Sequence, residues 1–155
     1  MKMTPSLALV IPILVVAMAG CSTPGGGQMG IFSATAPVVA ILHEDLMLGE
    51  AVGYMDRTGT ISVRSAVNPE LRCVGEFRYT GSKTGTATLR CNDGAEAVLS
   101  FNALSTLSGY GYGRTSRGPA SFTYGLTPDE AAQYLTLPPR KRLVQKKEGP
   151  RLEDV

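Results

Sequence analysis

CVGEFRYTGSKTGTATLRCNDGAEAVLSF, residues 73–101, is the stretch of sequence that decides the fold. If Cys73 and Cys91 form a disulfide, a single hairpin register follows around a turn at residues 81–83. That register places the apolar side chains on one face and alternating Thr, Arg and Glu side chains on the other, which is the pattern of a half-buried hairpin. The predicted partners are Gly75 with Leu89, Phe77 with Ala87, and Tyr79 with Gly85.

The next turn, Asn92-Asp93-Gly94, is typical of a three-residue hairpin loop with glycine in the left-handed position. With this loop length Leu99 lies opposite Ala87 and Phe101 lies opposite Gly85. A two-residue loop would place polar residues on the apolar face, since a one-residue slip reverses every side chain. Residues 73–101 are therefore predicted to form three antiparallel strands.

The rest of the chain continues this pattern. Its 155 residues leave room for one domain, and 18 glycines and 10 prolines favour a turn-rich β protein. Apolar or alternating segments at residues 37–42, 46–54 and 60–65 are separated by turn signals. We expect an all-β domain over residues 37–137, with about seven strands in an antiparallel meander that closes as a small barrel or folds as a sandwich. A four-residue loop in its second hairpin would pair Tyr54 with Ile61 and Val52 with Val63.

Glycines and aromatic residues alternate in the segment GYGYG at residues 109–113, and aromatic residues recur at 122 and 124. A hairpin centred near Arg117 would place Tyr112 opposite Phe122 and Tyr110 opposite Tyr124. Such an aromatic ladder could stack on a sugar ring or line an apolar pocket. The alternative is that these four rings fill the core.

Thr127-Pro128-Asp129-Glu130 is a capping box with proline at the first helical position. It predicts one short C-terminal helix that reaches about Leu135. Residues 138–155 carry six basic and three acidic residues, a net charge of +3, and are predicted to be a disordered tail. This tail could contact anionic lipids or another anionic envelope polymer, or could be a solvated chain end.

The N-terminus contains a basic residue, a short apolar run and Met18-Ala19-Gly20-Cys21. These features resemble the lipobox and signal peptide of bacterial lipoprotein precursors. The resemblance implies cleavage of residues 1–20 and lipidation of Cys21. Ser22 implies an outer-membrane location in the cell envelope. There the domain would face the periplasm or, as the alternative, the cell surface. Residues 21–36 would be a flexible tether. The alternative is an ordinary secretory signal with a chance cysteine.

Export leaves Cys73 and Cys91 to pair with each other in an oxidising compartment, unless both are buried free thiols. The sequence holds one histidine, His43, which lies beside two carboxylates in a turn-like segment. Neighbouring residues of a strand point in different directions, so this segment does not predict a metal site or a catalytic base. We therefore expect neither an enzyme nor a cofactor, and no nucleic-acid partner.

Two functions remain open on the sequence alone. The first is a non-catalytic, lipid-anchored envelope protein that acts as an interaction or structural module, with another envelope protein or an anionic envelope polymer as its partner. The alternative is a binder of a glycan or an apolar molecule through the aromatic hairpin. A filled interior would argue against the ligand binder, whereas an exposed apolar patch would favour the interaction module.

Overall fold

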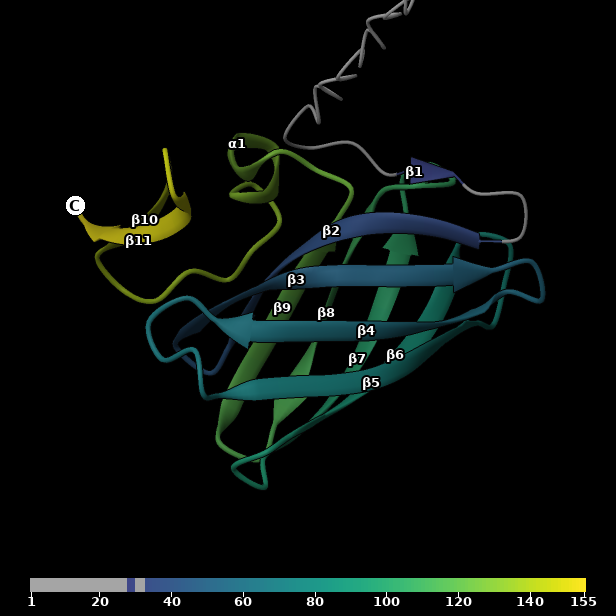
Figure 1. Cartoon of the computed structure of the whole chain (residues 1–155), viewed down its shortest axis with the longest axis horizontal. Helices are drawn as coiled ribbons and strands as arrows, with labels where there is room; N and C mark the ends of the chain where they lie inside the picture. Colours follow the sequence, from purple (N-terminus) through teal and green to yellow (C-terminus); the bar gives the residue numbers. More distant parts are fainter. Residues whose placement is uncertain (1–27, 30–32) are drawn as a thin grey trace, which may run out of the picture.

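The chain folds into a closed antiparallel barrel, shown in Figure 1. The structure is a computed structural model that describes residues 28–29 and 33–155. Each strand from β2 to β9 pairs with the next one along the chain, and β9 pairs back with β2, which closes the sheet. The prediction of an all-β meander is confirmed, and closure identifies it as a barrel. The barrel strands are β2 (Ser33–Leu42), β3 (Asp45–Tyr54), β4 (Thr58–Ser65), β5 (Arg72–Tyr79), β6 (Thr84–Cys91), β7 (Glu96–Ala103), β8 (Gly109–Thr115) and β9 (Gly118–Tyr124).

Two hydrophobic clusters hold the molecule together. One lies inside the barrel and takes alternate residues of most strands, for example Ala87, Leu89 and Leu99. The other lies outside the barrel, where Val39, Ile41 and Leu46 meet the C-terminal segment. Strand β2 contributes to both clusters, so the continuous apolar run at residues 37–42 reflects burial on both faces.

The predicted register of β5, β6 and β7 is confirmed. Cys73 lies opposite Cys91 and is joined to it by a disulfide, and Phe77 lies opposite Ala87. Across the next loop Leu99 also lies opposite Ala87. Gly94 has φ of 88°, the left-handed conformation expected for the three-residue loop.

The predicted register of the β3–β4 hairpin is wrong. Ile61 pairs with Ala51 rather than with Tyr54, and Val63 pairs with Gly49. The loop of residues 55–57 is shorter than expected, and Arg57 takes its left-handed position with φ of 68°. As a result Val52 and Tyr54 lie on the outer face of the barrel, and small residues of β3 face the interior.

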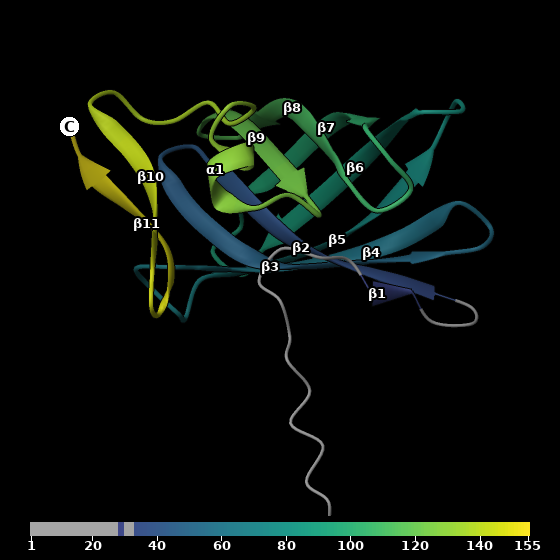
Figure 2. The ribbon, with the colours of Figure 1, turned by 90° about the horizontal axis from the view of Figure 1, so that it is seen from above.

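The C-terminal segment packs against the outside of the barrel. Helix α1 (Pro128–Ala131) begins with the predicted capping box, in which Thr127 and Glu130 bond reciprocally, but it ends before the expected Leu135. Beyond it, β10 (Lys141–Lys146) and β11 (Gly149–Asp154) form a hairpin beside α1 in both views (Figures 1 and 2).

The expectation of a disordered tail at residues 138–155 is therefore wrong. Leu143 is 7% exposed, and together with Leu152 it packs on the outer cluster that includes Leu46 of β3. The prediction of disorder rested on the polar composition of the whole segment. It did not take account of these two leucines, which pack against the barrel.

The N-terminal boundary also differs from the prediction. Strand β2 begins at Ser33, and β1 (Gln28–Met29) pairs with its first residues. Residues 28–29 and 33–36 are thus strand rather than tether, since residues 33–36 pair with the end of β3 and residues 28–29 pair with β2. The predicted signal peptide, residues 1–20, and Cys21 lie outside the described residues. No helix in the described part of the chain is long and apolar enough to cross a membrane.

Candidate ligand-binding site

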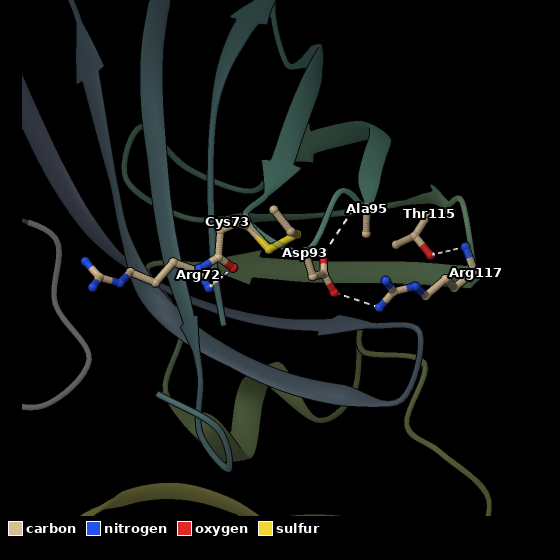
Figure 3. Close-up of polar contacts among 8 residues, drawn as sticks. Arg72, Cys73, Asp93, Ala95, Thr115 and Arg117 are labelled. Atoms are coloured by element: carbon tan, nitrogen blue, oxygen red, sulfur yellow. Dashed lines mark hydrogen bonds and ion pairs between the residues drawn. A yellow bond between two sulfur atoms is a disulfide. The ribbon is translucent and has the colours of Figure 1, made fainter. Parts of the chain in front are cut away.

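The two ends of the barrel differ in how they are closed. At one end the disulfide lies beside an ion pair between Asp93 and Arg117, with Nη1 of Arg117 2.7 Å from Oδ2 of Asp93 (Figure 3). The same Asp93 side chain accepts a hydrogen bond from the N–H of Ala95 at 3.0 Å. This hydrogen bond, with the nearby Arg117, lowers the pKa of Asp93. These contacts connect the β6–β7 and β8–β9 loops across the end of the barrel.

The opposite end holds a pocket of about 750 Å³. This volume lies within the range of about 300–1,000 Å³ that is usual for sites that bind small molecules. The pocket reaches from the loops after β3, β5 and β7 down to side chains inside the barrel, such as Ile61 and Ala51. Its lining is mostly apolar. Small residues that face inward, including Ala36 and Gly53, leave this end of the interior unfilled.

An aromatic cluster forms one wall and the floor of the pocket. Phe101 is 3% exposed and lies at its centre, with its ring centroid 5.0 Å from that of Tyr79 and 5.9 Å from that of Phe77. Phe122 and Tyr124 lie 6.5 and 6.2 Å from it on the other side. Most of these contacts are edge-to-face, a favourable geometry for aromatic rings.

Polar groups are few and lie near the mouth. The hydroxyl oxygens of Tyr79 and Tyr124 are 3.5 Å apart. Burial, and secondarily the contact with Tyr79, raises the pKa of Tyr124 well above its usual range, so this phenol stays neutral. The guanidinium of Arg57 lies 4.8 Å from the ring centroid of Tyr79. The pocket thus presents a large apolar surface with a small number of oriented polar groups.

The predicted aromatic ladder is wrong as a unit. Tyr110 lies opposite Thr123 and Tyr112 lies opposite Ser121, so both tyrosines are on the outer face of the barrel. Phe122 and Tyr124 point inward and line the pocket. The β8–β9 loop has two residues between Thr115 and Gly118, and this loop length shifts the register by one residue from the predicted one.

The outward-facing tyrosines form a separate cluster. The ring of Tyr110 stacks on that of Tyr134, with centroids 4.5 Å apart, and Tyr112 meets Tyr110 edge-on at 5.7 Å. Tyr110 therefore helps to dock the segment after α1 onto the barrel. Tyr112 remains 45% exposed.

The remaining predicted features occupy structural positions. His43 lies in the tight turn between β2 and β3 with φ of 62°, and its backbone N–H donates to the carbonyl of Pro119. Residues 28–29 and 33–155 contain no group of three or more His, Cys, Asp or Glu side chains that could hold a metal ion. In the basic hairpin, Lys141, Arg142, Lys146 and Arg151 all form ion pairs with acidic side chains of the same hairpin.

Sequence reasoning missed most of the pocket. It placed Phe77, Tyr79 and Phe101 on one apolar face, and that shared face was the available signal. It had no indication that Arg57, a turn residue, would cover Tyr79. The pocket depends on closure of the barrel, in which β9 pairs with β2 and the small residues of β2 and β3 come to face the strands that carry these rings.

No match to this chain was found among protein-family models, curated proteins or solved structures.

Proposed function

We propose that this protein binds a small, largely apolar molecule in the open end of its barrel, without catalysing a reaction. The 750 Å³ pocket carries the proposal. Apolar ligands favour concave sites lined with aromatic and aliphatic side chains and a few polar groups. The aromatic cluster around Phe101, with Arg57 and two tyrosine hydroxyls near the mouth, has this composition.

Pocket geometry favours this function over the interaction module. Close packing is the normal state of a protein interior, and large voids are rare there. Bulky side chains fill the disulfide end of this barrel, whereas the pocket end combines aromatic rings with small residues. The empty volume of the pocket therefore lies at the end of the barrel where a ligand can enter between the loops after β3, β5 and β7.

Gly53 allows a direct test. It lines the pocket, and a Cβ atom added there would lie 3.5 Å from Cζ of Phe77, an ordinary van der Waals distance. We therefore expect Gly53→Leu to fold and to fill part of the pocket. The added side chain could displace about four methylene equivalents of ligand at about 0.8 kcal/mol each, which corresponds to up to roughly two-hundredfold weaker binding.

The measurement is a fluorescence titration with Nile red, a neutral apolar dye. Val52→Leu is the matched control, because it introduces the same residue one position away on the outer face. The proposal predicts dye binding by the wild type and by Val52→Leu, and much weaker binding by Gly53→Leu. Equal affinity of all three folded proteins, or no binding by the wild type, would contradict it.

We also propose that the protein is held at the cell envelope by a lipid on Cys21. The support is the sequence Met18-Ala19-Gly20-Cys21, which resembles a lipobox. Several acyl chains provide a stable anchor, since each buried methylene contributes about 0.8 kcal/mol. Cys21→Ala should release the protein from membranes or leave an unprocessed precursor. An unchanged mass and unchanged membrane fraction would disprove the assignment.

A second candidate function is contact with another envelope protein. The rim of the pocket exposes Tyr54, Met55 and Leu104, with 47%, 78% and 46% of their surface accessible. These side chains could meet a protein partner beside the mouth. Crosslinking in cells would distinguish the two functions: a recurrent protein partner whose capture is lost in Met55→Ser supports the interaction module, and a co-purifying small molecule supports the ligand binder.

A further inference from the structure

The charged residues that line the pocket are all of one sign. They are Arg57 and Lys83, and no acidic side chain belongs to the lining among the described residues. The positive charge of the lining is opposite in sign to the net charge of the surrounding domain. Residues 21–137 contain 8 basic and 10 acidic residues, a net charge of 8 − 10 = −2. The mouth is therefore basic on a slightly acidic body.

Arg57 is held in place over the mouth. Its guanidinium lies over the ring of Tyr79, and its Nη2 donates to the carbonyl oxygens of Gly81 and Ser82 in the β5–β6 loop. Lys83 is the next residue of the same loop. A guanidinium has five N–H donors, and the hydrogen bonds described here use only those on Nη2. The Nη1 and Nε groups form no hydrogen bond with a residue that the structure describes, so either can donate a charge-assisted hydrogen bond to a carboxylate oxygen.

The acidic neighbour of Arg57 is turned toward its own loop. The Asp56 carboxylate accepts hydrogen bonds from the backbone N–H of Thr58 at 3.0 Å and from its hydroxyl at 2.6 Å. It does not line the pocket. Below the two cations the lining is mostly apolar and the phenol of Tyr124 is neutral, so no described residue of the lining carries a negative charge that would repel an anion at the rim.

We propose that the ligand is a single-chain amphiphile, a hydrocarbon chain that ends in a carboxylate. The carboxylate binds Arg57 and Lys83 at the rim, and the chain packs against Phe101 and Tyr124. This inference rests on the proposed function of the pocket and adds the chemical class of its ligand. Along the end of β3 and the first residue of the loop after it, the lining extends from Ala51 to Met55, four residue steps or about 13 Å of extended chain, which suits a chain of medium length.

The test compares decanoate with decanol, which has the same chain without the charge, as competitors of bound Nile red. We expect decanoate to bind at least about tenfold more tightly than decanol, the effect of one charge-assisted hydrogen-bonded contact. Arg57→Gln should weaken decanoate about tenfold and leave decanol unchanged. Lys83→Gln should have a smaller effect of the same kind, because lysine acts as a single point charge.

Arg78→Gln is the matched control for net charge, since Arg78 is exposed on the outer face of the neighbouring strand. Equal affinity for the acid and the alcohol, or equal loss of both in Arg57→Gln, would overturn the carboxylate assignment while Nile red binding still supported the pocket. Loss of decanoate binding in Arg78→Gln as large as that in Arg57→Gln would also overturn it. If Nile red binds equally well to Gly53→Leu, the pocket itself is not the site and the proposed function fails with it.

Discussion

The disulfide between Cys73 and Cys91 allows a quantitative prediction about stability. The two cysteines are 18 residues apart in the chain, and in the chain-entropy model such a cross-link contributes about 3 kcal/mol. Domains of this size are stable by only about 5–15 kcal/mol in total. We therefore expect the double variant Cys73→Ala/Cys91→Ala to remain folded and to melt about 10 °C below the wild type.

Urea unfolding followed by far-ultraviolet circular dichroism measures the effect, since the chain has no tryptophan. The cross-link acts on the unfolded chain, so its removal should expand that chain and increase the slope of unfolding free energy against urea. Wild-type protein reduced with dithiothreitol is the matched control. It keeps both sulfur atoms and therefore separates the loss of the cross-link from the small cavity left at the fully buried Cys73.

The reasoning would be refuted by a variant that melts within about 2 °C of the wild type with an unchanged urea slope. A second refutation concerns the two ends of the barrel. The disulfide lies at the end opposite the pocket, so Nile red affinity of the folded variant should equal that of the wild type. A large loss of affinity would show that the two ends are coupled.

Two further predictions concern the C-terminal segment and acid stability. Leu143→Ala should lower the free energy of unfolding by about 2 kcal/mol, whereas the exposed Gln145→Ala should change it little; equal effects in urea unfolding would show that the hairpin is not docked. Hydrogen bonds from the Ala95 N–H and from Thr127 lower the pKa values of Asp93 and Glu130, respectively. Their contribution is complete above the pKa values of the unfolded chain and is lost as the pH falls, so the melting temperature should decrease below about pH 4. A melting temperature that stays constant down to pH 2, in about 0.1 M salt, would contradict this.

Local features of this sequence were sufficient where several constraints agreed over a short distance. The register of β5, β6 and β7 satisfies the cysteine pairing, the alternation of polar and apolar residues, and the glycine of the Asn92-Asp93-Gly94 turn at the same time. The start of α1 depends on a capping box of four adjacent residues. In both cases the interacting groups are close in the sequence, so the pattern identifies the structure.

Tertiary structure decided the features that the local sequence pattern left ambiguous, namely which face of the sheet a strand's side chains occupy and how long a hairpin loop is. The alternating residues of β3 could face either way, and Leu46 and Leu48 face outward because the C-terminal hairpin covers them there. The β8–β9 hairpin could turn over two or three residues, and this choice separates Tyr112 from Phe122.

The pocket depends on closure of the whole barrel. The β7–β8–β9 meander places Phe122 and Tyr124 beside Phe101 across the glycines of β8, and pairing of β9 with β2 closes the lumen in front of these rings. The empty volume arises because small residues of β2 and β3 face those rings across the lumen. Such a void is a property of side chains far apart in the sequence, and for this reason the sequence alone determined the register of β5, β6 and β7 and the disulfide but not the site.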